Sequence, residues 1–167
     1  MPPIVKPTAW LLVVCGCTCR EPQPSGHEPT TAPRSAASDV LRAGVPIDTA
    51  FYRIRASAAE DCPAPDPALI MPGKRRVRVE LSIEPLSDLQ VPANPYYARL
   101  VDADRNVYEA TLGGCGPALA PTLPARGQTA HGAVVFDVPP SARTLTLLYA
   151  PELVGTETAV LAIELGR

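Results

Sequence analysis

Histidine and cysteine, the residues most often used for acid–base, nucleophilic or metal chemistry, number two and five in this chain of 167 residues. Nucleophilic catalysis needs a Ser, Cys or Thr beside a base that a third group orients. From residue 48 onward the only histidine is His131, in GQTAHGAVVF, and no G-x-S-x-G pattern accompanies it. We therefore expect His131 to be an exposed loop side chain and predict that the protein is not an enzyme.

Asp102, Asp104 and Asn106 reproduce the first ligands of a D-x-D-x-N calcium loop. An EF-hand loop would continue with Gly at position 107 and a carboxylate at 113, where this chain has Val107 and Gly113. A hairpin turn explains the three polar residues better, because Asp and Asn favour turns and tolerate left-handed backbone. Zinc and copper sites need several His, Cys or Met ligands, so we expect neither a metal nor another cofactor.

Cys17 is the cysteine whose chemistry the sequence predicts most directly. It follows MPPIVKPTAWLLVVCG, in which one cation precedes the apolar run at 9–14, the order typical of a secretory signal. Val14 lies three places before Cys17 and the small Gly16 lies directly before it, as the lipobox of bacterial lipoproteins requires. The pattern predicts a lipoprotein signal peptide at 1–16 and lipidation of Cys17. A plain cleaved signal is the alternative, since a membrane-spanning helix needs about 20 apolar residues.

Lipidation would place the protein in the cell envelope. Each buried methylene contributes about 0.8 kcal/mol, so two or three acyl chains would attach it stably to the outer or cytoplasmic membrane, facing the periplasm or the exterior. Residues 17–47 are rich in Pro, Ser, Thr and Ala and lack periodicity, which predicts a disordered tether. The net charge of −2 provides no basic field for nucleic acid.

Residues 48–167 show the period of two that is typical of half-buried strands. In KRRVRVELSIEP the apolar residues alternate with charged and polar ones, so one face is predicted to be core and the other wet. Turn-forming residues separate seven such segments: FYRIRA, KRRVRVELSIEP, YYARLVDA, VYEATL, AVVFDV, TLTLLYA and AVLAIEL. This pattern predicts an all-β, immunoglobulin-like antiparallel sandwich of about seven strands, with a small closed barrel as the main rival.

Two cysteines fall within the predicted domain, Cys62 after its first strand and Cys115 after its fourth. An exported protein meets an oxidising compartment, so we expect these two thiols to form a disulfide. Closing a loop of about 54 residues contributes roughly 4 kcal/mol in the chain-entropy model. No tryptophan follows Cys62, unlike in antibody domains, so we expect an aliphatic core with a few Tyr and Phe.

The stretches VPANPYYARLVDADRNVYEATLGGC and GAVVFDVPPSARTLTLLYAPE resemble a family of bacterial extracytoplasmic immunoglobulin-like domains of unknown function. The resemblance covers about residues 48 to 166 and implies a fold similar to that of a secreted mycobacterial immunoprotective antigen. Its motifs are strand cores and turns, so it implies no catalytic residues. In the hairpin, Asn106 stands where the family usually has Gly, and Asn can adopt the left-handed backbone needed there.

Two groups of residues are candidate contact surfaces. Arg75, Arg76 and Arg78 align on the predicted wet face of one strand and could bind anionic lipid heads or acidic glycans, although such charges often guard a sheet against edge pairing. Tyr96 and Tyr97 combine aromatic rings with hydroxyls, as interface residues do. Strand alternation requires one tyrosine to face the core, and we favour packing for the pair.

The sequence thus favours a non-catalytic, lipid-anchored extracytoplasmic module that contacts an envelope protein or glycan. A metal- or small-ligand-binding accessory protein and a purely structural envelope component are the alternatives. The first would show an exposed apolar or aromatic patch, and the second a concave polar pocket.

Overall fold

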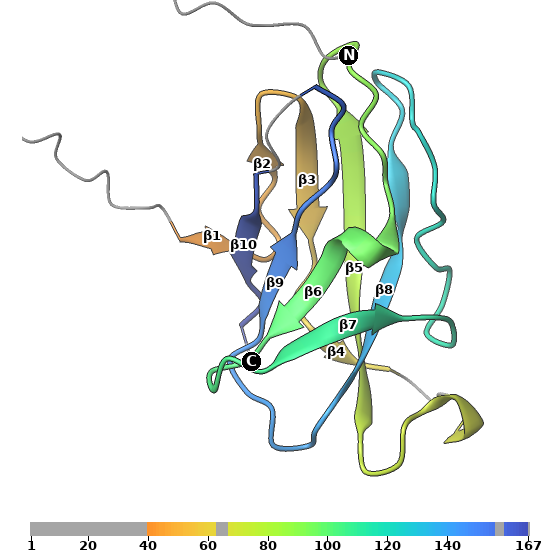
Figure 1. Ribbon diagram of the computed structural model, residues 1–167, viewed down its shortest axis with the longest axis vertical. Helices are drawn as coiled ribbons and strands as arrows, with labels where there is room; N and C mark the ends of the chain where they lie inside the picture. Colours follow the sequence, from red (N-terminus) through yellow and green to blue (C-terminus); the bar gives the residue numbers. More distant parts are fainter. Residues whose placement is uncertain (1–39, 63–66, 156–158, 167) are drawn as a thin grey trace, which may run out of the picture. The chain divides into compact units, whose positions relative to one another are not determined.

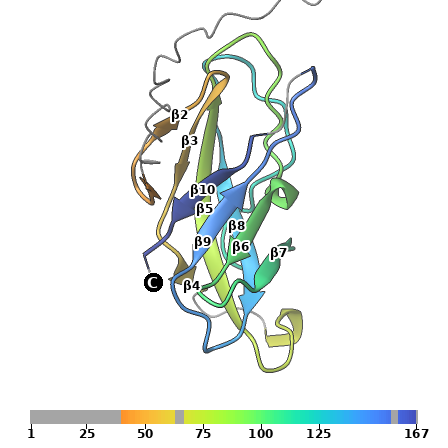
Figure 2. The same ribbon diagram turned by 60° about the vertical axis from the view of Figure 1, so that its left-hand side comes forward.

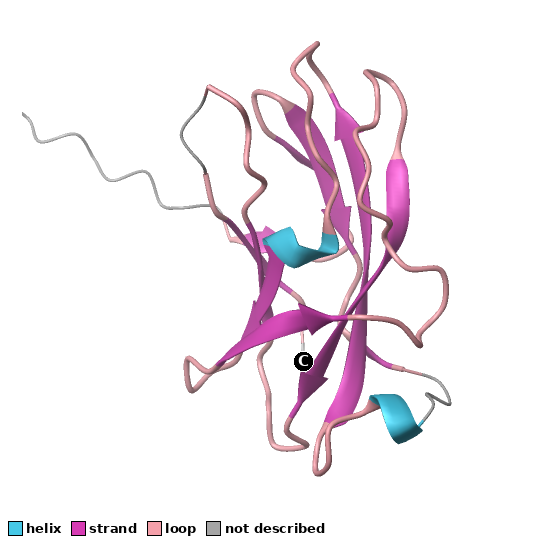
Figure 3. Ribbon diagram, turned by 45° about the vertical axis from the view of Figure 1, so that its right-hand side comes forward, coloured by secondary structure: helices cyan, strands magenta, loops and turns pink. Residues whose placement is uncertain are grey.

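The computed structural model describes residues 40–62, 67–155 and 159–166. The predicted signal peptide, Cys17 and the tether up to residue 39 lie outside the described residues. The described part is built from strands and two single-turn 3-10 helices (Figures 1 and 3). No helix in this part is long and apolar enough to cross a membrane. The elements in chain order are β1 (Leu41–Arg42), β2 (Ile47–Asp48), β3 (Tyr52–Ala56), β4 (Glu60–Asp61), η1 (Pro67–Leu69), β5 (Arg75–Pro85), η2 (Pro95–Tyr97), β6 (Ala98–Val101), β7 (Val107–Thr111), β8 (Ala130–Val138), β9 (Thr146–Tyr149) and β10 (Leu161–Glu164).

The strands form two layers that share β7. The first sheet has the order β1-β10-β9-β6-β7, and the second has the order β7-β8-β5-β3-β2 with β4 added beside β5. Val107 to Glu109 pair with β6, whereas Ala110 and Thr111 pair with β8, so β7 crosses from one layer to the other (Figure 1). The path begins at β1 and ends at β2, which do not pair with each other. The fold is therefore an all-β sandwich, as predicted, and not the closed barrel.

The core lies between the layers and follows the alternation read from the sequence. The largest fully buried side chains are Tyr149 and Phe136, among many Leu, Ile and Val. Tyr52 and Tyr97 pack edge-on against Tyr149, an arrangement that aromatic rings prefer. The apolar positions of the alternating segments on β3, β5, β8 and β9 are buried, as alternation predicts. Leu112, which continues the alternation of VYEATL, is 71% exposed, because β7 ends at Thr111 and the chain leaves the sheet there.

The folded domain begins earlier than predicted. The sequence pattern places residues 41–47 in the tether, yet β1 pairs in parallel with β10, and β2 pairs with β3 (Figure 2). Leu41, Ala43 and Ile47 pack against the core between the sheets. Strands of two residues are too short to show a period, which is why the sequence pattern missed them. We call residues 41–48 the N-terminal strap.

Candidate functional site

Arg76 is not available for binding, contrary to the sequence prediction. Its side chain is only 1% exposed and forms a two-pronged ion pair with Asp137 of β8, at Nε–Oδ1 2.8 Å and Nη2–Oδ2 2.9 Å. The guanidinium also donates to the carbonyl oxygens of Gly113, at 3.1 Å, and of Leu69. The Asp137 hydrogen bond raises the pKa of Arg76. Arg76 does point away from the core, as alternation requires, but two loops cover it.

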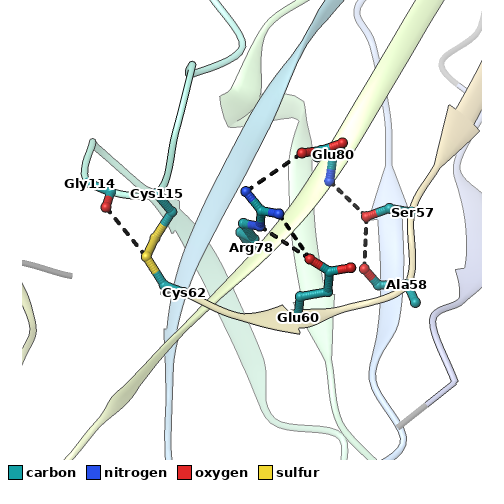
Figure 4. A network of polar contacts seen from close by, with 8 residues as sticks. All are labelled: Ser57, Ala58, Glu60, Cys62, Arg78, Glu80, Gly114 and Cys115. Carbon is teal, nitrogen blue, oxygen red and sulfur yellow. Dashed lines mark hydrogen bonds and ion pairs between the residues drawn. A yellow bond between two sulfur atoms is a disulfide. The ribbon is translucent and has the colours of Figure 1, made fainter. Parts of the chain in front are cut away.

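The disulfide lies beside this covered patch. Cys62 and Cys115 are bonded, as predicted, with their Cα atoms 5.4 Å apart and a sequence separation of 53. Both cysteines are buried against Val135 of β8. The Cys62 sulfur lies 3.4 Å from the Gly114 carbonyl oxygen (Figure 4). The disulfide therefore fixes the loop after β7 to the end of β4, over the outer side of the second sheet.

Arg75 and Arg78 are partly exposed, but acidic neighbours already pair with both. Arg75 forms an ion pair with Asp61. Arg78 lies 3.0 Å from Glu60 and 3.6 Å from Glu80 (Figure 4). Because an acidic side chain lies so close to each of these arginines, the electric field of the basic run is largely cancelled at distances beyond the Debye length. The three arginines thus do not form a continuous cationic surface, and the structure separates them into one buried and two neutralised side chains.

The Asp102–Asn106 segment is a hairpin turn, as predicted. The Asp102 carboxylate accepts from the backbone N–H groups of Asp104 and Asn106, both at 2.9 Å, from the Asn106 amide and from the Tyr108 hydroxyl at 2.5 Å. The left-handed residue is Arg105 (φ 65°) and not Asn106, whose N–H and amide are held by Asp102. Both oxygens of Asp102 are thus occupied by donors. Within the described ranges no group of three or more His, Cys, Asp or Glu could hold a metal ion.

His131 is exposed, as predicted, but it belongs to β8 and not to a loop. It lies opposite Ser82 of β5 in the strand pairing. These two side chains line an open groove of about 530 Å³ together with Arg55, Ser57 and Glu80. Ser57 Oγ is occupied by the Glu80 N–H, at 3.0 Å, and by the Ala58 carbonyl, at 2.8 Å (Figure 4). The groove can offer charges and hydroxyls to a polar ligand.

Tyr96 and Tyr97 have different environments. Tyr97 is half-buried, with its ring 6.5 Å from that of Tyr149, so the predicted packing role is confirmed for this residue. Tyr96 is 53% exposed. The single-turn helix η2 carries both tyrosines and is capped by Asn94. The Asn94 side chain accepts from the Tyr96 N–H at 3.0 Å, and Pro95 occupies the first helical position. Local capping thus turns one ring inward and leaves the other at the surface.

Tyr96 stands at one side of a groove of about 410 Å³ on the outer side of the first sheet. The groove is lined by Tyr96, Tyr97, Arg99, Leu148, Ala150, Glu152 and Val160. Leu148 and Ala150 flank buried Tyr149 and so point outward from β9 and the residue after it. Val160, just before β10, is 60% exposed. The floor is apolar, while Arg99 and Glu152 supply charge at its margin.

The outer side of the first sheet also carries apolar and charged side chains beyond the groove. Strand register places Val101 beside Val107 and Arg99 beside Glu109 on this side, since Leu100 between them is core. Four exposed large apolar residues of the described chain lie here: Val40, Tyr96, Val107 and Val160. We call the outward residues of the first sheet, with Tyr96 and Val160, the contact surface.

The second sheet is the opposite case. Its outward positions carry Arg53, Arg55, Glu80, Ser82 and Glu84. None of the exposed large apolar residues in the described ranges lies on β2, β3, β4, β5 or β8. Arg53 pairs with Asp48 at 2.7 Å and with Glu84 at 3.7 Å. One side of the sandwich is therefore charged and internally paired, and the other combines exposed apolar side chains with the ion pair of Arg99 and Glu109. An exposed apolar patch with a polar margin is typical of interaction sites.

Sequence reasoning found Tyr96 but missed most of the contact surface. Leu148, Val107 and Val160 stand at outward positions, where strict alternation predicts polar residues. The signal was the loss of alternation in TLTLLYA and AVLAIEL, where apolar residues occupy both faces of the strand. Two neighbouring strands, β9 and β10, both show it.

The fold is shared with solved structures of bacterial proteins. The yjhA protein from Bacillus subtilis is similar with a TM-score of 0.60 and 14% identity, over 75% of this chain and 99% of that one. The secreted protein MPT63 from Mycobacterium tuberculosis gives 0.58 and 13%, over 80% and 100% of the two chains. Part of ycdA, a candidate lipoprotein from Bacillus subtilis, gives 0.54 and 13%, over 71% of this chain and 38% of that one.

These similarities confirm the fold that the sequence motifs implied, including its likeness to a secreted mycobacterial protein. No protein-family model and no curated protein sequence matches the chain. At identities of 13–14% the shared feature is the sandwich itself.

Proposed function

We propose that this protein is a lipid-anchored, non-catalytic extracytoplasmic module that binds an envelope protein or glycan through the contact surface. The observation that carries the proposal is the contrast between the two outer sides of the sandwich. One is a sheet face with exposed Tyr96, Val107 and Val160 around an apolar groove, and the other is charged and paired within itself. Tyr and Arg are enriched at binding hot spots, and an apolar centre is typical of the buried core of an interface.

Three observations support a location outside the cytoplasm. Cys17 has the preceding residues of a lipobox. Two proteins of the same fold are described as a candidate lipoprotein and as a secreted protein. A disulfide between Cys62 and Cys115 fits an oxidising compartment.

The non-catalytic part of the proposal rests on the surroundings of His131. A general base must be held in place by a partner that orients the ring. His131 is exposed on a sheet face, and its neighbour Glu80 is engaged with Arg78 at 3.6 Å. The polar groove around His131 supports a second candidate function, the binding of a small charged ligand. Screening charged small molecules against the unaltered protein and against His131→Ala tests this function.

Site-specific photo-crosslinking in the native envelope tests the contact surface. A photoreactive amino acid replaces Val160, which lies in the groove, and in a matched protein it replaces Leu112, which is 71% exposed but lies beyond the end of β7. We expect crosslinked products, identified by mass spectrometry, from position 160 and few from position 112. Adding Tyr96→Ala to the protein with the photoreactive residue at position 160 should reduce the yield of crosslinked product several-fold. Equal labelling from both positions would contradict the proposal.

A further inference from the structure

Arg55 differs from the other arginines of β3 and β5 because no acidic side chain neutralises it. The others each form an ion pair with a carboxylate: Arg53, Arg75, Arg76 and Arg78. Arg55 is exposed, and in the described ranges no carboxylate lies within ion-pair distance of its guanidinium. Its side chain lines the polar groove beside His131. An exposed guanidinium without an internal partner is available to an anion from outside the protein.

Strand register brings Arg55 into one row with Ser82 and His131. Arg55 of β3 is paired with Ser82 of β5, and Ser82 is paired with His131 of β8. All three side chains point away from the core, because the residues on either side of each one in its strand are buried. Neighbouring strands lie about 4.8 Å apart, so the longer Arg and His side chains flank a short serine and can converge above it.

The groups in this row are hydrogen-bond donors. Arg55 contributes the planar fork of a guanidinium, Ser82 a hydroxyl, and His131 at least one imidazole N–H in either of its protonation forms. A guanidinium fork binds both oxygens of a carboxylate at once, and hydrogen bonds between charged groups are stronger than those between neutral ones. The row of Arg55, Ser82 and His131 therefore suits a carboxylate.

Glu80 adds an acceptor to the same groove. It lies two residues from Ser82 on β5, which is about 7 Å along the strand. Its Oε1 is 3.6 Å from Arg78 Nη1, and its side chain remains 44% exposed, so its oxygens can accept further hydrogen bonds (Figure 4). This carboxylate would repel an anion that filled the groove, but it would accept from hydroxyls. The matching ligand therefore carries a negative group at one end and hydroxyls at the other.

We propose that the polar groove binds an acidic sugar, with the sugar carboxylate at Arg55, Ser82 and His131 and the hydroxyls toward Glu80. This inference rests on the second candidate function above and names the class of ligand. The volume of about 530 Å³ lies within the range of small-molecule sites, about 300–1,000 Å³. An amino acid fits less well, because its ammonium is one carbon from its carboxylate and cannot reach Glu80 from the row.

Titration of the full-length protein with three small compounds tests this inference. The protein is kept in a detergent that has no sugar headgroup, and binding is measured by calorimetry and by saturation-transfer NMR. Glucuronate is the probe, glucose lacks the carboxylate, and acetate lacks the hydroxyls. We expect glucuronate to bind about tenfold or more tightly than either of the others, because only glucuronate can engage both the donor row and Glu80.

Two arginine variants locate the binding. Arg55→Gln removes the charge of the row and should weaken glucuronate binding about tenfold, with little effect on glucose. Arg53→Gln is the matched control, since Arg53 lies on the same face of β3 but pairs with Asp48 and does not line the groove. Both arginines are exposed, so thermal melts should show that both variants are folded. Equal binding of the three compounds, or glucuronate binding that Arg55→Gln leaves unchanged, overturns the inference.

The same measurements separate this inference from the proposed functions. If another charged compound binds the unaltered protein but not His131→Ala, the second candidate function stands and only the acidic sugar is wrong. If no charged compound binds, both are wrong. Crosslinking from position 160 remains an independent test of the contact surface, because Val160 and His131 belong to opposite outer sides of the sandwich.

Discussion

At the scale of single residues, the Asp102 carboxylate organises one end of the sandwich. It accepts from the Tyr108 hydroxyl, at 2.5 Å, and from the Asn106 and Asp104 N–H groups. The Tyr108 hydrogen bond, followed by those of Asn106, lowers the pKa of Asp102 from 3.8 to about 2. Loss of water around Tyr108, together with the hydrogen bond to Asp102, raises the pKa of the phenol to about 12. Both groups therefore keep their hydrogen-bonding forms over a wide pH range.

The stability of the fold at low pH should depend on the Asp102 carboxylate. Because the pKa of Asp102 is lower in the fold than its ordinary value of 3.8, the carboxylate stabilises the fold fully above that pH and loses its effect as the pH falls toward 2. Asp102→Asn should lower the melting temperature at pH 6 and make it less dependent on pH between 4 and 2. Circular dichroism melts across this range measure both effects.

The matched control is Asp104→Asn, on the exposed tip of the same turn. It keeps the backbone N–H that donates to Asp102. Parallel pH profiles for the unaltered protein and Asp102→Asn would contradict the assigned role.

At the scale of strands and loops, the sequence predicted the inner side of the sheets well and the outer side poorly. Alternation in RRVRVELSIEP follows from the geometry of a strand, so Val77, Val79 and Leu81 could be assigned to the core from the sequence alone. What covers the other side depends on distant segments. The loops that bury Arg76 contain Leu69 and Gly113. No local sequence pattern predicts that these loops cover Arg76.

The same limit applies to the contact surface and the N-terminal strap. Tyr96 could be named from its residue type, but its neighbours Leu148 and Val160 come from strands more than fifty residues away in the chain. Two-residue strands carry too little pattern to be recognised. Pairing of Cys62 with Cys115 could be predicted, because the described domain contains only these two cysteines and the predicted export implies an oxidising compartment.

Removal of this disulfide should destabilise the domain strongly. For a sequence separation of 53, the chain-entropy model assigns the crosslink about 4 kcal/mol of the free energy of unfolding. Cys62→Ala with Cys115→Ala should lower the urea midpoint accordingly, and the loop after β7 should lose protection from hydrogen exchange. Chemical reduction of the unaltered protein provides the comparison. A loss below about 1 kcal/mol would mean that Arg76 and its partners hold the loops without it.

At the scale of the whole described domain, the two outer sides differ in composition. The charged side of the second sheet carries several ion pairs, including Arg53 with Asp48 and Arg78 with Glu60. The outer side of the first sheet has the ion pair of Arg99 with Glu109, but it also leaves Tyr96, Val107 and Val160 exposed. Exposed apolar area of this kind is retained at a cost in solubility, which supports its use as a binding surface.

Attachment to the membrane depends on the Cys17 thiol in our proposal. Cys17→Ser should leave the protein unprocessed or release it into the soluble fraction, because no sulfur remains to be acylated at the lipobox position. Membrane fractionation and intact-mass measurement of both proteins check this expectation. Cys15→Ser and Cys19→Ser are matched controls and should leave partitioning unchanged. Unaltered mass and partitioning after Cys17→Ser would remove lipidation from the account.

The N-terminal strap also determines how the domain responds to mechanical tension. A pull on the chain that precedes Val40 reaches the sandwich first through β1 and then through β2, each paired over only two residues. The longer β5–β8 pairing and the crosslink from Cys62 to Cys115 lie beyond that point along the chain. Under load, the eight residues of the strap should detach first and extend by roughly 28 Å, at about 3.5 Å per residue. The domain would thus lengthen its reach from an anchor while β3, β5 and β8 and the strands β6, β7, β9 and β10 of the first sheet stay folded.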